Sequence, residues 1–424
     1  MDAAERAARI VRALVETVKP GFAVGLWNGE RIGPPDGPLL RINDSDALRR
    51  LLRRPKFTTI ADLWVSRAID VEDGSLFDIV ALRPEGKLKS KLRALPKLQL
   101  ARDLPALVFA RRASAVDELA GDNPFVSGSS KVAIEHHYDI SNDFYRLFLD
   151  ERMVYSCGYF TDFANGIDQA QADKLEHICR KLRLKPGETL LDIGCGWGAM
   201  LIYAARNYGI IGHGVSLSEE QTKLARERIR AEGLDGRITI DIKSYTELDG
   251  SFDKISSIGM FEHIGIANHD AYFGAVKRLL KPDGIYLHHA ITRRTKRSRR
   301  QTLRKGPEYQ ALVKYIFPGG EVDTIAMTVG NLETHGFYVH DVENLREHYA
   351  RTCLIWAERL KARFPEAIAE VGEPKARLWL LYLTACSIGF ERGSAQIFQT
   401  VATKRKRGPS PLPPSRADLY SSAS

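Results

Sequence analysis

The segment LLDIGCGWG, residues 190–198, constrains the fold of this chain more than any other. It places an apolar stretch directly before a turn containing Gly194, Gly196 and Gly198, and helix-forming residues follow. Glycine lets a backbone turn sharply and approach a ligand closely, because it has no Cβ atom. The segment therefore predicts a buried strand, a tight turn and a helix that begins beside a bound ligand.

Short apolar segments alternate with amphipathic ones after this point. The alternation predicts a doubly wound, Rossmann-like α/β fold with a mostly parallel sheet. Strands are expected at 189–194, 213–218, 238–244, 254–260, 285–291 and 397–405. Helices are expected at 200–209, 221–233 and 377–393, and an insertion at about 292–331 interrupts the strand order.

The length of 424 residues allows two domains. Residues 1–110 predict a smaller α+β domain with strands at 22–27, 58–65 and 77–83, and residues 111–128 a linker. Residues 86–112 are rich in Lys, Arg, Leu and Pro, which fits either a basic linker or an amphipathic helix on an interface. The α/β domain is expected at 129–405, and the Pro/Ser-rich residues 406–424 are expected to form a flexible tail.

Composition limits the cellular compartment in which we expect the protein and the kinds of partner that it can bind. The net charge of +9 suggests an anionic partner, either nucleic acid, anionic lipid or an acidic metabolite. The 5 cysteines show no CxxC and no paired Cys/His spacing, so we expect reduced thiols, no zinc site and no other metal. No apolar run reaches about 18 residues and the N-terminus does not resemble a signal peptide, so we expect a cytoplasmic protein.

The details of the glycine turn favour S-adenosylmethionine over a nicotinamide or flavin. The spacing is GxGxG rather than GxGxxG, and Asp192 precedes the first glycine, where methyltransferases often hold an acidic residue. The next strand, HGVSLS, ends without the Asp or Glu that would hold a ribose hydroxyl in a nicotinamide site.

Further sequence blocks occur in a fixed order around this turn. They are HHYDISNDFYRLFLD (136–150), MVYSCGYF (153–160), GVSLSEEQ (214–221), GMFEHIG (259–265), LHHAI (287–291), KYIFPGG (314–320) and EHYARTCLIW (347–356). In this order they resemble the cyclopropane-fatty-acyl-phospholipid synthase family, which includes mycolic acid cyclopropane synthases and related fatty acid methyltransferases. The resemblance covers roughly residues 129–405 and implies a class I methyltransferase fold.

The resemblance implies which residues contact S-adenosylmethionine. Ser216 and Gln221 would supply neutral hydrogen bonds, which suits a strand without an acidic end. The candidate contacts, taken together with those beside the glycine turn, are Tyr155, Ser156, Asp192, Gly194, Gly196, Gly198, Ser216, Leu217, Gln221 and Tyr245.

The resemblance also implies that the base is a bound bicarbonate rather than a side chain. The positions that match its site are Cys157, Glu262, His289, Ile291 and Tyr349. An alkene is a poor nucleophile, so the reaction needs a sulfonium methyl group held at contact distance. Attack leaves a carbocation, and a small anion could stabilise it and accept the proton whose loss closes a three-membered ring. Glu262 would orient this anion.

Structural roles compete with these assignments. Cys157 could be an inert buried thiol, Tyr349 an ordinary packed aromatic residue, and His263 either structural or a ligand group. His288 and His289 alternate sides of a strand, so only one faces the site, and the family spacing favours His289.

A basic cluster follows the block LHHAI (287–291). It contains eight Lys or Arg residues from Arg293 to Lys305. We expect it to hold the enzyme at the anionic inner face of a membrane, from which a lipid chain enters an apolar tunnel. Nucleic acid is the second choice, because the aromatic residues of a single-strand platform are missing, and a solvated loop is the third.

Two departures from the family pattern concern the acceptor side. GluValAspThr at 321–324 replaces the usual ProSer, and Ser244 stands where an acidic residue commonly precedes Tyr245. We expect these changes to alter adenine contacts or the mouth of the lipid tunnel.

The expected reaction is therefore cyclopropane formation on the cis double bond of an unsaturated phospholipid acyl chain, without nucleic acid. A methylene- or methyl-branched product is the close alternative, and a small-molecule or RNA methyltransferase the second alternative, because they share the fold. A catalytically silent lipid-binding relative is disfavoured by the presence of Glu262, His289 and Tyr349. The N-terminal domain is expected to serve substrate docking or homodimer contacts.

Overall fold

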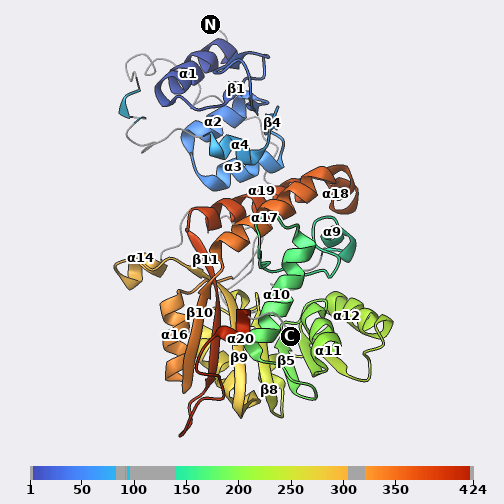
Figure 1. The fold of residues 1–424 in the computed structure, drawn as a ribbon. Coiled ribbons are helices and arrows are strands. Elements are labelled where there is room, and N and C mark those ends of the chain that lie inside the picture. The colour runs from blue at the N-terminus through green and yellow to red at the C-terminus, as the bar shows by residue number, and fades with distance from the viewer. Residues whose placement is uncertain (1–2, 83–90, 92, 96–139, 304–319, 421–424) are drawn as a thin grey trace. The chain divides into compact units, whose positions relative to one another are not determined.

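The structure is a computed structural model that describes residues 3–82, 91, 93–95, 140–303 and 320–420 (Figure 1). The chain divides into two compact units. Of the described residues, the first unit takes those before residue 96 together with Gly372–Thr384, and the second takes the others. The expected domain end at 110, the linker at 111–128 and most of the basic segment 86–112 lie outside the described residues.

The first unit combines helices with a four-stranded sheet in the order β2-β1-β3-β4. Its elements are α1 (Ala3–Val18), β1 (Ala23–Gly25), β2 (Arg31–Ile32), β3 (Leu39–Ile42), α2 (Ser45–Arg53), α3 (Phe57–Val65), β4 (Ile69–Glu72) and α4 (Leu76–Ala81). The α+β composition is as expected, and the strand expected at 22–27 is β1.

Two segments predicted as strands are helices. Residues 58–65 lie in α3, where Trp64 Nε1 donates to the carbonyl of Arg377 at 2.9 Å and the Arg377 guanidinium covers the Trp64 ring. This long-range contact outweighs the strand preference of the β-branched residues. Of the strand predicted at 77–83, residues 77–81 lie in α4 instead, because Ser75 and Asp78 form a capping box that starts this helix.

The second unit is built on a seven-stranded sheet in the order β10-β11-β9-β8-β5-β6-β7. Strands β9, β8, β5, β6 and β7 are parallel, and β11 is antiparallel to both of its neighbours. The strands are β5 (Thr189–Ile193), β6 (Ile211–Ser216), β7 (Ile238–Ile242), β8 (Phe252–Ile258), β9 (Leu280–Arg293), β10 (Phe337–Asn344) and β11 (Ala395–Lys404). The predicted doubly wound α/β fold is confirmed.

Helices cover both faces of this sheet (Figure 1). Those beside the sheet include α10 (Ile167–Leu182), α11 (Ala199–Tyr208), α12 (Glu219–Ala231), α13 (His269–Leu279) and α16 (Ile325–Thr334). The other helices among the described residues are α9 (Asn142–Arg146), α14 (Arg299–Leu303), α17 (Arg346–Ala362), α18 (Phe364–Val371), α20 (Ala417–Tyr420) and α19 (Glu373–Glu391), whose first part belongs to the first unit. Short 3₁₀ turns lie at η1 (Tyr245–Glu247), η2 (Phe261–His263) and η3 (Ile266–Asn268). No helix among the described residues is long and apolar enough to cross a membrane.

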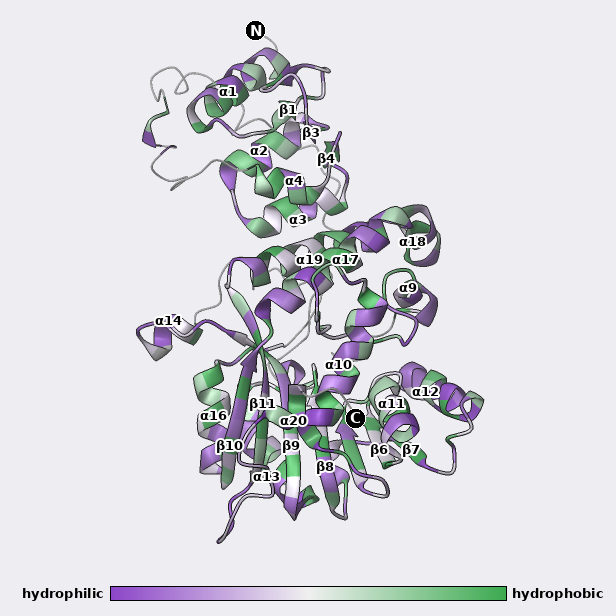
Figure 2. Ribbon diagram, in the orientation of Figure 1, coloured by the Kyte–Doolittle hydropathy of each residue, from purple (hydrophilic) through white to green (hydrophobic). Residues whose placement is uncertain are grey.

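The core of the second unit lies on both faces of the sheet. Leu190 of β5 packs with Leu201 of α11 in one apolar cluster, whereas Leu191 and Ile193 pack with Tyr272 of α13 in another. Successive strand residues face opposite sides, so a strand covered on both faces is apolar throughout. Figure 2 shows the contrasting pattern of alternating hydrophobic and hydrophilic residues along the outer helix α12.

Two expected boundaries differ in the structure. The interruption of the strand order is shorter than 292–331, because β9 continues to Arg293 and α16 begins at Ile325. Within the expected tail 406–424, the described residues up to 420 contain α20, and Arg183 pairs with Asp418 at 3.0 Å.

The apolar cluster that contains Leu190 and Leu201 predicts a difference in stability between two alanine substitutions. Leu201 is 0% exposed, so Leu201→Ala leaves a cavity and should lower the free energy of unfolding by about 2–5 kcal/mol. Ile211 is 52% exposed, so Ile211→Ala should cost no more than about 1 kcal/mol. Urea denaturation followed by circular dichroism measures both, and equal losses would contradict the assignment of the core.

Candidate active site

The glycine turn follows β5 as the sequence predicts. Gly194, Gly196 and Gly198 have φ angles of 80°, 53° and 80°, which side chains strongly disfavour. A Cβ atom on Gly194 would lie 2.7 Å from Cγ of Met260. Residue 194 must therefore be glycine for steric as well as conformational reasons.

A cavity of about 610 Å³ opens beside this turn, at the carboxyl ends of the parallel strands. This is where open α/β sheets bind ligands. The predicted cofactor contacts that line it are Tyr155, Ser156, Asp192, Gly194, Gly196, Ser216, Leu217, Gln221 and Tyr245.

Gly198 is the one predicted contact that does not line the cavity. A Cβ atom there would lie 3.4 Å from Cβ of Ala225 on α12. Its glycine serves the close approach of α11 and α12, so the assignment of Gly198 as a cofactor contact is not supported by its position.

The polar groups at the end of β6 are neutral. Ser216 Oγ donates to Gln221 Oε1 at 3.4 Å, and Ser218 caps α12 by accepting from the amide of Gln221. Ser244 lies beyond Ile242, where β7 ends, and forms a capping box with Glu247 at the start of η1. The departure at Ser244 therefore has a local structural role, and the strand expected at 238–244 is shorter.

Asp192 lines the cavity as a buried acid. It is 3% exposed, and its Oδ1 accepts from Ser256 Oγ at 2.7 Å. Burial raises the pKa of Asp192 to about 6, against the lowering effects of Ser256 and Lys174.

Lys174 of α10 is a cavity residue that the sequence analysis did not identify. It is 1% exposed, and its Nζ donates to Ser156 Oγ at 3.0 Å. Burial lowers the pKa of Lys174 to about 8, although the charges of Asp150 and Asp192 oppose the shift. Its position on the apolar face of an amphipathic helix, beside Leu175 and Ile178, was the available signal.

Glu262 and Ile291, predicted to belong to one site, are brought together. Glu262 Oε1 accepts from the amide of Ile291 at 2.6 Å, and Oε2 is buried without a hydrogen-bond partner among the described residues. Burial raises the pKa of Glu262 to about 7, so the group is poised between acid and carboxylate near neutral pH.

His288 and His289 face opposite sides of β9, as expected. His288 Nδ1 lies 2.8 Å from the hydroxyl of Tyr286, and its ring packs on Phe261 in the core. His289 Nδ1 lies 3.2 Å from Nε2 of Gln399, and its Nε2 is buried without a partner among the described residues. His263 lines the cavity.

Cys157 and Tyr349 converge on the carbonyl of Leu345. Cys157 Sγ donates to it at 3.7 Å and the amide of Tyr349 donates to it at 3.0 Å. The Tyr349 and Tyr155 rings both contact Trp356, with centroids 6.2 Å and 5.3 Å away, which links Tyr349 to the cavity wall. Burial raises the pKa of Cys157 far above its usual range, so Cys157 is a thiol and not a nucleophile.

The acidic segment 321–324 lies against the Glu262 loop. The amide of Glu321 donates to the carbonyl of Glu262 at 3.1 Å, and Asp323 Oδ2 accepts from Thr328 at 2.8 Å. Burial raises the pKa of Asp323 to about 7, and the charge of Glu262 raises it further. Asp323 does not line the cofactor cavity. Its position therefore does not support the expectation that the 321–324 departure alters adenine contacts.

Comparisons with known proteins agree with this geometry. Residues 127–400 match the family Mycolic acid cyclopropane synthetase. A probable fatty acid methyltransferase of Pseudomonas putida is 43% identical over 68% of this chain and 73% of its own. Cyclopropane-fatty-acyl-phospholipid synthase of Escherichia coli K12 is 41% identical over 64% of this chain and 67% of its own.

A solved structure extends the likeness to the fold. The mycolic acid cyclopropane synthase CmaA1, complexed with SAH and CTAB, superimposes with a TM-score of 0.62 at 34% identity, over 65% of this chain and 98% of that one. The sheet, the glycine turn and the cavity define a class I S-adenosylmethionine-dependent methyltransferase. The chain belongs to the mycolic acid cyclopropane synthetase family, and its enzymatic type is that of the cyclopropane synthases.

The glycine turn gives a binding prediction. Gly194→Ala should lower the affinity for S-adenosylmethionine by about tenfold or more, because the new methyl group meets Met260 and the backbone must shift. Gly250 also has a positive φ, 96°, but nothing within 4 Å of its Cβ position, so Gly250→Ala controls for backbone strain. Isothermal titration calorimetry compares them, and wild-type affinity in Gly194→Ala would refute the placement of the turn.

The buried carboxyls give a prediction about pH. The folded protein keeps a proton on Glu262 up to about pH 7, whereas an ordinary Glu releases it near 4.5. The stability that the folded protein gains by keeping Glu262 protonated is therefore full below about pH 4.5 and is lost as the pH rises toward 7. Relative to wild type, Glu262→Gln should gain roughly 1–3 kcal/mol of unfolding free energy between about pH 5 and pH 7.

Asp323→Asn should show the same trend, because the pKa of Asp323 is also about 7. Glu227 is exposed on α12, so Glu227→Gln should follow the wild type. Urea denaturation at several pH values measures the differences, and parallel curves for all four proteins would show that these carboxyls are ionised in the fold.

Proposed function

We propose that this enzyme transfers a one-carbon unit from S-adenosylmethionine to the cis double bond of an unsaturated phospholipid acyl chain, and so forms a cyclopropane ring. The observation that carries the proposal is a pair of buried atoms, Glu262 Oε2 and His289 Nε2, that have no hydrogen-bond partner among the described residues and lie in the same unit as the cofactor cavity. The named activities of the E. coli and P. putida relatives support a fatty acyl acceptor.

The cavity residues would hold the methyl donor. Ser216 and Gln221 offer neutral hydrogen bonds, and the open turn at Gly194 and Gly196 lets the backbone approach the ligand. S-adenosylmethionine supplies an electrophilic methyl group there. Tyr155 lines the cavity and belongs to an aromatic group with Trp356, whose ring faces suit a developing positive charge.

The second group of residues fits a small oxyanion. His289 Nε2 can donate a hydrogen bond, Glu262 Oε2 can donate in its protonated form, and both are desolvated and unpartnered among the described residues. Bicarbonate supplies a base when bound. Glu262, anchored by the Ile291 amide, would orient the anion, and the Tyr349 hydroxyl and the backbone at Cys157 would complete its site.

The basic cluster supports contact with an anionic membrane. Of its described residues, Arg294, Lys296, Arg297 and Arg300 are exposed, whereas Arg293 is held by the carbonyl of Thr302 at 3.2 Å. Exposed cations near a lipid surface each contribute about 1 kcal/mol of attraction to anionic headgroups. We propose that this segment holds the enzyme at the bilayer while an acyl chain enters the site.

A single assay tests the reaction. The full chain is incubated with labelled S-adenosylmethionine and vesicles of unsaturated phosphatidylglycerol, and the released fatty acids are analysed by mass spectrometry. Glu262→Gln should lower turnover by about tenfold or more with cofactor affinity within twofold of wild type, whereas Glu227→Gln should match wild type in both. Absence of added carbon in the acyl fraction would sink the lipid proposal.

The same assay separates the finer alternatives. Fragmentation distinguishes a ring from a methylene or methyl branch. Buffers stripped of carbon dioxide should slow turnover and added bicarbonate should restore it; an unchanged rate would remove bicarbonate from the proposal. Zwitterionic vesicles should be poorer substrates than anionic ones, and salt-sensitive retention of RNA instead of vesicles would favour an RNA methyltransferase.

A further inference from the structure

Nδ1 of the His289 ring contacts Gln399, whereas Nε2 has no hydrogen-bond partner in the part of the chain that the structure describes. In the pairing of β9 with β11, His289 lies directly opposite Gln399, and both side chains are 0% exposed. Nδ1 of the ring is 3.2 Å from Gln399 Nε2. Which nitrogen carries the proton depends on what Gln399 presents to the ring.

Lys181 of α10 decides the orientation of the Gln399 amide. Its Nζ lies 2.9 Å from Gln399 Oε1. An ammonium group can only donate, so the amide atom facing it must be the oxygen. The amide NH₂ then faces His289 and donates to Nδ1, and a neutral ring must carry its proton on Nε2.

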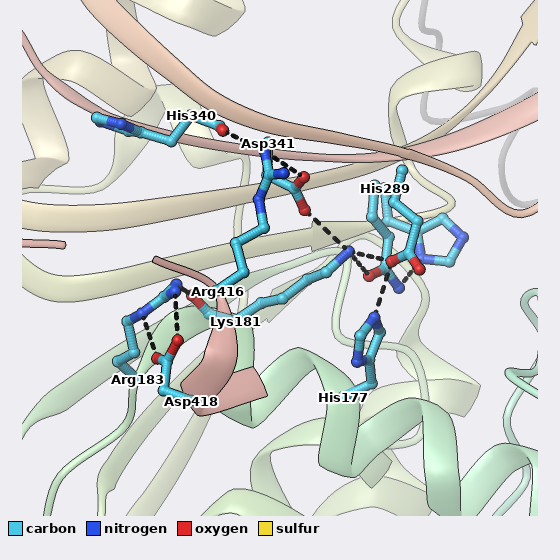
Figure 3. Close-up of polar contacts among 10 residues, drawn as sticks. His177, Lys181, Arg183, His289, His340, Asp341, Arg416 and Asp418 are labelled. Atoms are coloured by element: carbon cyan, nitrogen blue, oxygen red, sulfur yellow. Dashed lines mark hydrogen bonds and ion pairs between the residues drawn. The ribbon is translucent and has the colours of Figure 1, made fainter. Parts of the chain in front are cut away.

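Lys181 contacts two carboxylates, which leaves its amine to donate to them and to Gln399. Lys181 is 0% exposed, but it pairs with Glu343 and lies 3.6 Å from Asp341. Burial would raise the pKa of Glu343, yet the hydrogen bond from His177 and the charge of Lys181 lower it to about 2. Figure 3 shows the Lys181 side chain extending from α10 toward His289, with dashed lines from its ammonium group to Asp341 and to its other partners.

The ring of His289 is neutral in this setting. Burial lowers its pKa well below the usual value, and the charges of Lys174 and Lys181 lower it further. The charge of Glu343 acts in the opposite direction. A single proton on the ring makes its position a defined property of the site.

We propose that Lys181 and Gln399 are positioning residues that fix His289 as the Nε2–H tautomer and so present a buried N–H donor to a small oxyanion. The inference deepens the proposed function and rests on it for the identity of the anion. The tautomer itself is independent of the proposed function, because it follows from the Lys181–Gln399–His289 hydrogen bonds alone.

Nitrogen NMR tests the tautomer in the full chain. Protein labelled with ¹⁵N at histidine gives distinct shifts for protonated and unprotonated ring nitrogens, and His289→Gln identifies the His289 signals by their loss. We expect Nε2 protonated and Nδ1 unprotonated in wild type. A wild-type His289 with its proton on Nδ1 overturns the proposal, whatever the enzyme does to lipids.

Gln399→Glu tests the relay. The carboxylate still accepts from Lys181 but can only accept from His289, so the ring proton should move to Nδ1 and the two shifts should exchange. Turnover should fall by about tenfold or more with cofactor affinity unchanged within twofold, because the variant loses the N–H donor. Gln396→Glu, the same change three residues away on β11, should keep the wild-type shifts.

The outcomes separate the two proposals. Retention of the Nε2–H tautomer in Gln399→Glu overturns the role of Gln399. A tautomer switch in Gln399→Glu, together with a wild-type protein that adds no carbon to lipid, supports the positioning role and removes the proposed function. A switch accompanied by loss of turnover supports both.

Discussion

The site depends on one constraint: ionisable groups are buried in the protein interior, where a charge is stable only beside a partner. Helix α10 places both Lys174 and Lys181 against the sheet with almost no exposure. Seven residues apart, they lie on the same helical face. Lys174 donates to Ser156 in the cavity wall, and Lys181 donates to Gln399 behind His289. One helix therefore contacts both the cavity wall and the residue behind His289.

Partners decide which buried acids carry charge. Glu343 meets Lys181 and His177, and its pKa falls to about 2. Glu262 accepts only from backbone amides, and burial raises its pKa to about 7. An isolated carboxyl in an apolar interior is more stable when protonated. The interior thus holds an ionised acid that fixes the scaffold and a protonatable acid beside Ile291, where the proposed anion would bind.

The sequence predicted those parts whose signals are local. The glycine turn and the strand–helix alternation defined the second unit, and the blocks GMFEHIG and LHHAI placed Glu262 just after one strand and His289 on another, as in the structure. It failed for 58–65, where the contact with Arg377 decides the structure, and it missed Lys174, because a helical lysine is usually solvated. Gln399 was unidentifiable, since its role needs the register of β11 against β9.

The C-terminal segment has the Pro- and Ser-rich composition that is typical of disorder, yet it forms ion pairs with the second unit. Lys181 faces two carboxylates, Asp341 and Glu343, so one positive charge meets two negative ones. Arg416 pairs with Asp341 at 3.0 Å and supplies the second positive charge. Asp341 is 17% exposed and lies 3.6 Å from Lys181, so the carboxylate that contacts the lysine behind His289 also contacts Arg416. This charged cluster thus links the Pro- and Ser-rich C-terminal segment to helix α10.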